Sequence, residues 1–216
     1  MKIEKRGEDS AYYAERREAL ADVVEQREHR SGRPCPGCET RCTTCGSISC
    51  QCNCSPDCAQ APGALSSDPE KFPIEAGIVP LVYAMRETEI GEPCWSCEGH
   101  PDAEGRTDKL PQIWFYVRHQ VYPDLLARYL WRLQFRGQIR NRWIVTVAPT
   151  DNSIDTTFAI SPDPNSDKLD LSALRQDIRV IGERMPAELA ELAKNGMEQI
   201  DEHIRKTREA GGQNKA

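Results

Sequence analysis

The chain has 216 residues and a mass of 24.4 kDa, enough for one sizeable domain and a smaller module. Hydrophobic residues make up 38%, charged residues 29%, and the mean hydropathy is -0.64, as in a soluble globular protein. No stretch approaches the roughly 18 apolar residues of a spanning helix, and the N-terminus lacks the apolar core of a signal peptide, so we expect a cytoplasmic protein that does not bind membranes. The net charge of -6 argues against a protein that coats nucleic acid with its whole surface.

The first predicted element is a helix over residues 9–30, because Tyr13, Leu20 and Val23 follow helical spacing among mixed charges. The next segment, residues 34–60, is rich in Cys, Thr, Ser and Pro and has almost no aliphatic side chains. It cannot repay its conformational entropy by apolar burial, so it is either disordered or folded by a ligand. Residues 61–73 carry the Pro and Gly punctuation of a linker.

From residue 74 onward the pattern is that of a folded domain with both helices and strands. In chain order we expect a helix at 75–89, a strand end or turn at 94–100, a strand at 113–117, a helix at 123–135 stopped by Gly137, a strand hairpin at 143–147 and 156–160, and helices at 171–184 and from Pro186.

The predicted fold class is therefore α+β: an α/β-type domain with a mixed sheet and C-terminal helices, plus a small Cys-rich metal-binding module. The expected units are an N-terminal helix at 1–33, the Cys-rich module at 34–60, the linker at 61–73, the α/β domain at 74–208 and a disordered tail at 209–216.

Ten cysteines are the compositional anomaly of the chain, and eight of them fall within 24 consecutive positions: Cys35, Cys38, Cys42, Cys45, Cys50, Cys52, Cys54 and Cys58. In a reducing cytosol such a cluster indicates a metal site before it indicates disulfides. The pairs Cys35-Pro-Gly-Cys38 and Cys42-Thr-Thr-Cys45 have the form of metal knuckles. Four thiolates satisfy one tetrahedral zinc ion, so eight predict two structural zinc ions or a small thiolate-bridged cluster.

An iron–sulfur cluster is the main alternative, because closely spaced thiolates in short loops also hold iron and sulfide. Cys38, Cys42 and Cys45 have the C-x3-C-x2-C spacing that resembles the cluster motif of radical-SAM enzymes, although too few strand and helix units follow it for their barrel. Disulfides or a redox-sensing array of thiols form a third possibility.

A second constellation lies at Cys94-Trp-Ser-Cys97-Glu-Gly-His100. This C-x2-C-x2-H pattern offers two sulfurs and one imidazole, which leaves an open position of the kind found in catalytic zinc sites. It also offers ligands that could attach the Cys-rich module to the α/β domain. The structural alternative is that Cys94 and Cys97 pack in the fold and His100 lies in a turn.

Four arginines recur every four residues along the predicted central helix: Arg128, Arg132, Arg136 and Arg140. Aromatic residues are interleaved with them, so this face could hold RNA phosphates while the rings stack on bases. The alternative, which we favour, is that the arginines pair with the acidic C-terminal helices while the apolar residues between them form core.

The run from Ile74 to His100 contains the helix EAGIVPLVYAM and the turn Ser96-Cys97-Glu98-Gly99-His100. It resembles the helix and S-C-x-G turn of the wybutosine-synthesis methyltransferase family of tRNA-modifying proteins. The resemblance covers less than half of the chain and implies a compact α/β fold acting on tRNA with S-adenosylmethionine. His100 stands where that family's pattern has a basic Arg, and the eight-cysteine segment has no counterpart.

Together these patterns predict a metal-binding protein whose cysteine cluster, with zinc as the leading ion, folds a module onto the α/β domain and presents it to a protein partner. An iron–sulfur redox protein or enzyme and an RNA-binding or RNA-modifying protein are the alternatives. Catalysis and oligomeric state are left open by the sequence.

Overall fold

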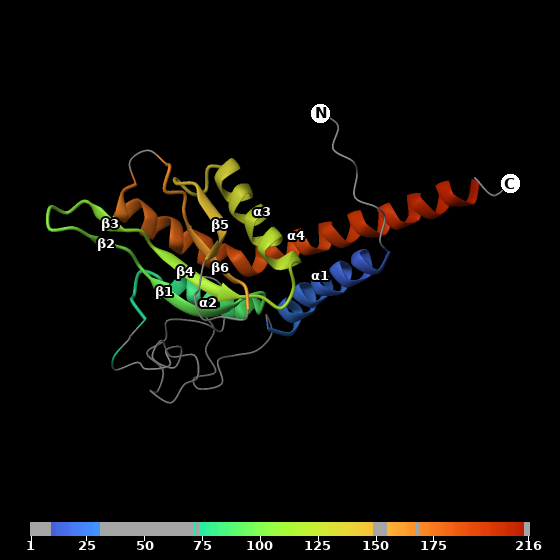
Figure 1. Ribbon diagram of the computed structural model, residues 1–216, viewed down its shortest axis with the longest axis horizontal. Coiled ribbons are helices and arrows are strands. Elements are labelled where there is room, and N and C mark those ends of the chain that lie inside the picture. Colours follow the sequence, from blue (N-terminus) through green and yellow to red (C-terminus); the bar gives the residue numbers. More distant parts are fainter. Residues whose placement is uncertain (1–9, 31–70, 72–73, 149–154, 167–168, 214–216) are drawn as a thin grey trace.

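Four helices and six strands make up the described part of the chain, which in this computed structural model covers residues 10–30, 71, 74–148, 155–166 and 169–213 (Figure 1). The elements are α1 (Ser10–Arg30), α2 (Val79–Thr88), β1 (Glu92–Cys97), β2 (His100–Pro101), β3 (Thr107–Lys109), β4 (Gln112–Tyr116), α3 (Val121–Phe135), β5 (Trp143–Ala148), β6 (Thr157–Pro162) and α4 (Leu171–Gln213). The Cys-rich module and the linker up to residue 70 lie outside the described residues.

The main sheet has the strand order β1-β4-β6-β5, and every neighbouring pair in it is antiparallel. The predicted α+β class is confirmed, but the prediction of a mixed sheet is wrong. The reason is the position of β6, which lies between β4 and β5. These two strands are joined through α3 and run parallel to each other, yet each meets only the antiparallel β6 on that side. The expected hairpin of β5 and β6 is present.

The core lies between one face of the sheet and the helices. Ile113 and Phe115 alternate with half-buried residues along β4 and are fully buried, and Phe115 stacks on Phe158 of β6. Met85 of α2 reaches the same region, since its Cε and the Phe115 ring both lie against Gly91. Alternation along β4 thus gives the sheet the apolar face that the helices cover.

Helix α4 runs along most of the molecule, with α2 and the sheet near its first half and α1 beside its second half (Figure 1). Buried aliphatic residues recur along it mostly every three or four positions, as expected of a helix that packs on one side. They include Leu174, Ile178, Ile181, Met185, Leu189, Ala193 and Ile200.

The predicted pair of C-terminal helices is wrong, because α4 is one helix of 43 residues that contains Pro186 in its interior. Proline removes one backbone hydrogen bond from a helix, but the buried face continues from Met185 to Leu189 across it. Packing on both sides therefore outweighs the local penalty. The helix also extends to Gln213, beyond residue 209 at which the sequence predicts a disordered tail.

Candidate metal centre

Cys97 and His100, both predicted as ligands, lie at the two ends of a tight turn between β1 and β2. Cys97 is the last residue of β1 and is buried, and His100 is the first residue of β2. Gly99 between them has a φ of 80°, and its N–H donates a hydrogen bond of 3.4 Å to the Cys97 Sγ. A backbone N–H directed at a sulfur stabilises a thiolate, so this turn favours the ionised form of the Cys97 thiol more than an extended segment would.

The third member of the group is Glu75, which the sequence analysis did not single out. One carboxylate oxygen, Oε1, lies 2.9 Å from His100 Nε2, and the other, Oε2, accepts a 2.7 Å hydrogen bond from the Glu98 N–H. The potential ligand atoms of Glu75, Cys97 and His100 all lie within 4.8 Å of one another. A carboxylate, a thiol and an imidazole from two separate segments thus lie close together.

A network of hydrogen bonds behind the group holds these two segments together. Glu98 accepts a 2.6 Å bond from the Gly77 N–H through Oε2 and pairs with Arg175 Nη2 at 2.6 Å through Oε1. The same Arg175 nitrogen donates to the Gly99 carbonyl at 3.3 Å. The loop that carries Glu75, the turn that carries Cys97 and His100, and helix α4 are therefore linked. Such outer contacts orient ligands in metal sites.

Electrostatics at the group oppose ionisation of the Cys97 thiol. Burial raises the pKa of the Cys97 thiol, the Gly99 hydrogen bond opposes that rise, and the nearby Glu75 carboxylate adds to it. An acidic group close to a buried thiol raises the cost of forming a second negative charge. A divalent cation would remove that cost, because it supplies positive charge to both groups.

Cys94, the other cysteine of the predicted C-x2-C-x2-H site, is left out of the group. It is exposed, and it lies at an irregularity of β1 where the register with β4 shifts between Pro93 and Trp95. Three steps along a strand cover up to about 10 Å, so two cysteines with this spacing on a strand are not held together as they would be in a tight turn. Burial raises the pKa of Cys94, and a hydrogen bond with Tyr116 opposes the rise.

The eight clustered cysteines, Cys35, Cys38, Cys42, Cys45, Cys50, Cys52, Cys54 and Cys58, lie outside the described residues. Their predicted role as zinc or iron–sulfur ligands therefore stays a prediction.

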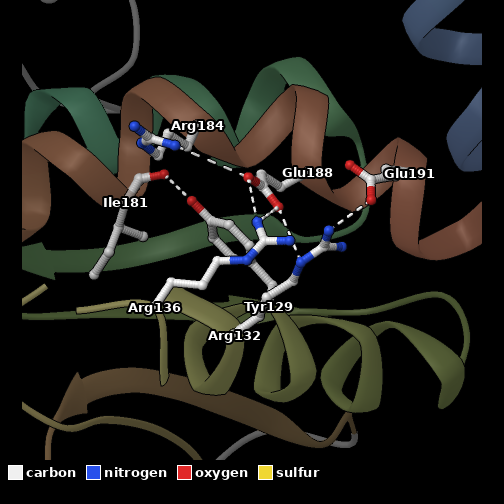
Figure 2. A network of polar contacts seen from close by, with 7 residues as sticks. All are labelled: Tyr129, Arg132, Arg136, Ile181, Arg184, Glu188 and Glu191. Atoms are coloured by element: carbon white, nitrogen blue, oxygen red, sulfur yellow. Dashed lines mark hydrogen bonds and ion pairs between the residues drawn. The ribbon is translucent and has the colours of Figure 1, made fainter. Parts of the chain in front are cut away.

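The predicted arginine face is engaged in ion pairs within the fold (Figure 2). Arg132 of α3, Arg136 directly after it and Arg184 of α4 surround Glu188, and Arg132 also pairs with Glu191 at 2.6 Å. Beneath them, the Tyr129 hydroxyl donates a 2.6 Å hydrogen bond to the Ile181 carbonyl. These contacts are the ones expected if the arginines pair with the acidic C-terminal helix.

The two remaining arginines are separated from this network. Arg128 pairs with Asp124 at 3.3 Å one helical turn away. Arg140 lies past the end of α3, after Gly137 turns the chain with a φ of 64°, and its backbone N–H donates to Asp177 at 2.8 Å. The four arginines therefore do not form one continuous helical stripe, and RNA binding by them stays a prediction.

Comparisons with family models, curated proteins and solved structures found no match for this chain. The resemblance of residues 74–100 to the tRNA-modifying methyltransferases accordingly stays a prediction. Within the described residues, no helix combines the length and apolarity that crossing a membrane requires.

Proposed function

We propose that this protein is a zinc-binding protein and that Glu75, Cys97 and His100 hold one zinc ion. The observation that carries the proposal is the convergence of their three ligand atoms within 4.8 Å. The hydrogen bonds of Glu98 and Arg175 support it, because they fix both segments of the group without occupying the sulfur or the imidazole.

The donor set favours zinc over the common alternatives. Magnesium and calcium prefer oxygen ligands, whereas zinc accepts sulfur, nitrogen and carboxylate oxygen in one tetrahedral site. An iron–sulfur cluster is held mainly by several cysteine thiolates, and this group offers one. An ionised thiol and a carboxylate together balance the charge of a divalent ion.

Three protein ligands leave a fourth tetrahedral position for water or for another ligand.

We extend the proposal to the Cys-rich module: its eight thiolates bind further zinc, and in the sequence the linker that follows it leads directly into the loop of Glu75. Bound metal would then fold the module next to the α+β domain, where it would be available to a protein partner.

The test is the metal content of the full-length protein, purified without chelators or air, in variants that differ from wild type at one residue. Cys97→Ser should lower the zinc content by one ion per chain, and His100→Gln should do the same. Cys94→Ser is the matched control, since this cysteine lies on the same strand outside the group and should retain all the zinc. With cobalt in place of zinc, wild type and the control should share thiolate-to-cobalt absorption that Cys97→Ser reduces.

Equal zinc in wild type, Cys97→Ser and His100→Gln would overturn the centre. If the purified protein contained iron and an equal amount of acid-labile sulfide, the Cys-rich module would hold an iron–sulfur cluster and the proposal of zinc there would be wrong. Far-UV circular dichroism of each variant separates loss of metal from loss of the fold.

A further inference from the structure

A cavity of about 190 Å³ lies where α1, α3 and α4 meet. None of these helices carries Glu75, Cys97 or His100, and their one link to that group is Arg175 of α4, which pairs with Glu98. Each helix contributes residues spaced by three, four or seven positions, so one face of each helix points into it. On α1 these are Tyr13, Arg16 and Leu20. The inference does not depend on metal binding.

The cavity exists because α1 packs closely on α4 and touches α3 only slightly. The end of the Leu20 side chain lies directly over Gly196 of α4, where a Cβ would lie 2.9 Å from Leu20 Cδ1. The cavity is thus a consequence of how three helices cross, and no described side chain fills it.

The floor of the cavity is apolar. Leu20, Val121, Leu125 and Ile200 line it and are themselves buried, and Leu192 is half-buried beside them. An engineered apolar cavity of about 150 Å³ is known to bind benzene. The volume available here therefore suits a ligand built on a single ring.

The rim of the cavity carries an excess of positive charge. Arg16 and Arg128 both pair with the one carboxylate of Asp124, Arg128 through its Nε at 3.3 Å. Each guanidinium has five N–H donors, so neither is saturated by half of a shared carboxylate. At the opposite end, the rings of Tyr13 and His203 lie 4.8 Å apart.

We propose that this cavity binds a small aromatic carboxylate. Its ring would lie on the leucine, valine and isoleucine floor, and its carboxylate would accept hydrogen bonds from Arg16 and Arg128 in the charge-assisted geometry that guanidinium groups favour. A neutral molecule of the same shape would make the same apolar contacts but would gain no affinity from the positive charge of the rim.

The probe is benzoate, titrated into the full-length protein by calorimetry and by amide chemical shifts, with neutral benzamide as its isostere. Benzoate should bind in the millimolar range or more tightly, about tenfold better than benzamide, with shifts confined to α1, α3 and α4. Arg128→Ala should weaken benzoate about tenfold and remove its advantage over benzamide. Arg136→Ala is the matched control, because Arg136 directly follows the same helix, lies outside the cavity and pairs with Glu188.

Leu192→Trp, which fills the cavity from a half-buried position, should abolish binding of both probes. No binding of benzoate at millimolar concentration would overturn the proposal. Binding that survives Leu192→Trp, or that Arg128→Ala and Arg136→Ala weaken equally, would place the ligand elsewhere and would overturn it as well. Far-UV circular dichroism of each variant is the control that tests whether its fold is intact.

Discussion

At the scale of single residues, the proposed metal centre depends on Gly99, which has a φ of 80° and lies between Cys97 and His100. A Cβ there would lie 2.9 Å from the Lys109 carbonyl oxygen and 2.8 Å from Pro111 Cδ. We expect Gly99→Ala to lower the free energy of unfolding by about 1–3 kcal/mol, measured by urea denaturation. It should also weaken zinc affinity, measured by chelator competition, because the Gly99 N–H no longer reaches the sulfur.

Gly105 is the natural control for this substitution, since it has nearly the same φ, 81°, but no atom within 4 Å of its Cβ position. Gly105→Ala should therefore show only the backbone penalty and leave zinc affinity unchanged. Equal effects of the two substitutions on stability and on zinc would show that crowding at Gly99 does not matter.

The residues of the centre were only partly predictable. Cys97 and His100 could be predicted because thiol and imidazole are typical metal ligands and their spacing in C-E-G-H suits a turn. Glu75 is one of 34 acidic residues and lies 22 positions before Cys97, so no local pattern distinguishes it. Its role follows from the loop before α2 coming to lie beside the end of β1, which is a tertiary contact.

At the scale of elements, α2 and α4 cross at Gly182, where an added Cβ would lie 2.5 Å from the Pro80 carbonyl oxygen. Backbone cannot move aside as a side chain can, so we expect Gly182→Ala to lower the free energy of unfolding by about 1–3 kcal/mol despite its better helix propensity. Thermal and urea denaturation measure the effect. In the same helix, Gly196→Ala meets only the flexible end of Leu20 and should be close to neutral.

If Gly182→Ala proved as harmless as Gly196→Ala, the two helices would not be in backbone contact at Pro80.

The same helix shows what local sequence patterns miss. Pro186 indicates a break, but the break does not occur because α4 buries residues on both sides of it. By contrast, Gly137 ends α3 as predicted, since its left-handed φ is a local property. The order of the strands could not be predicted from the sequence, because β6 inserts between β4 and β5, the two strands that α3 connects.

At the scale of the whole molecule, helix α1 belongs to the same core as the rest of the described chain. Its Ala19, Leu20 and Val23 are buried in the cluster that also contains Ile200 of α4. Arg17 of α1 pairs with Asp201 of α4 at 2.7 Å, and Glu15 of α1 lies 3.2 Å from His119 Nε2. The sequence predicts a separate N-terminal unit because few apolar residues of α1 are visible among its charges.

A shared core predicts that damage in α1 destabilises the distant sheet. We expect Leu20→Ala to lower the free energy of unfolding by about 2–5 kcal/mol in one cooperative transition. The probe is tryptophan fluorescence, since all four tryptophans (Trp95, Trp114, Trp131 and Trp143) lie outside α1. Glu18→Ala, an exposed change on the same helix, should stay within about 0.5 kcal/mol of wild type. Leu20→Ala could instead leave the midpoint of the fluorescence transition unchanged while the loss of helical circular dichroism begins at lower denaturant. That result would mean that α1 unfolds independently, because only a common core couples its packing to the tryptophans.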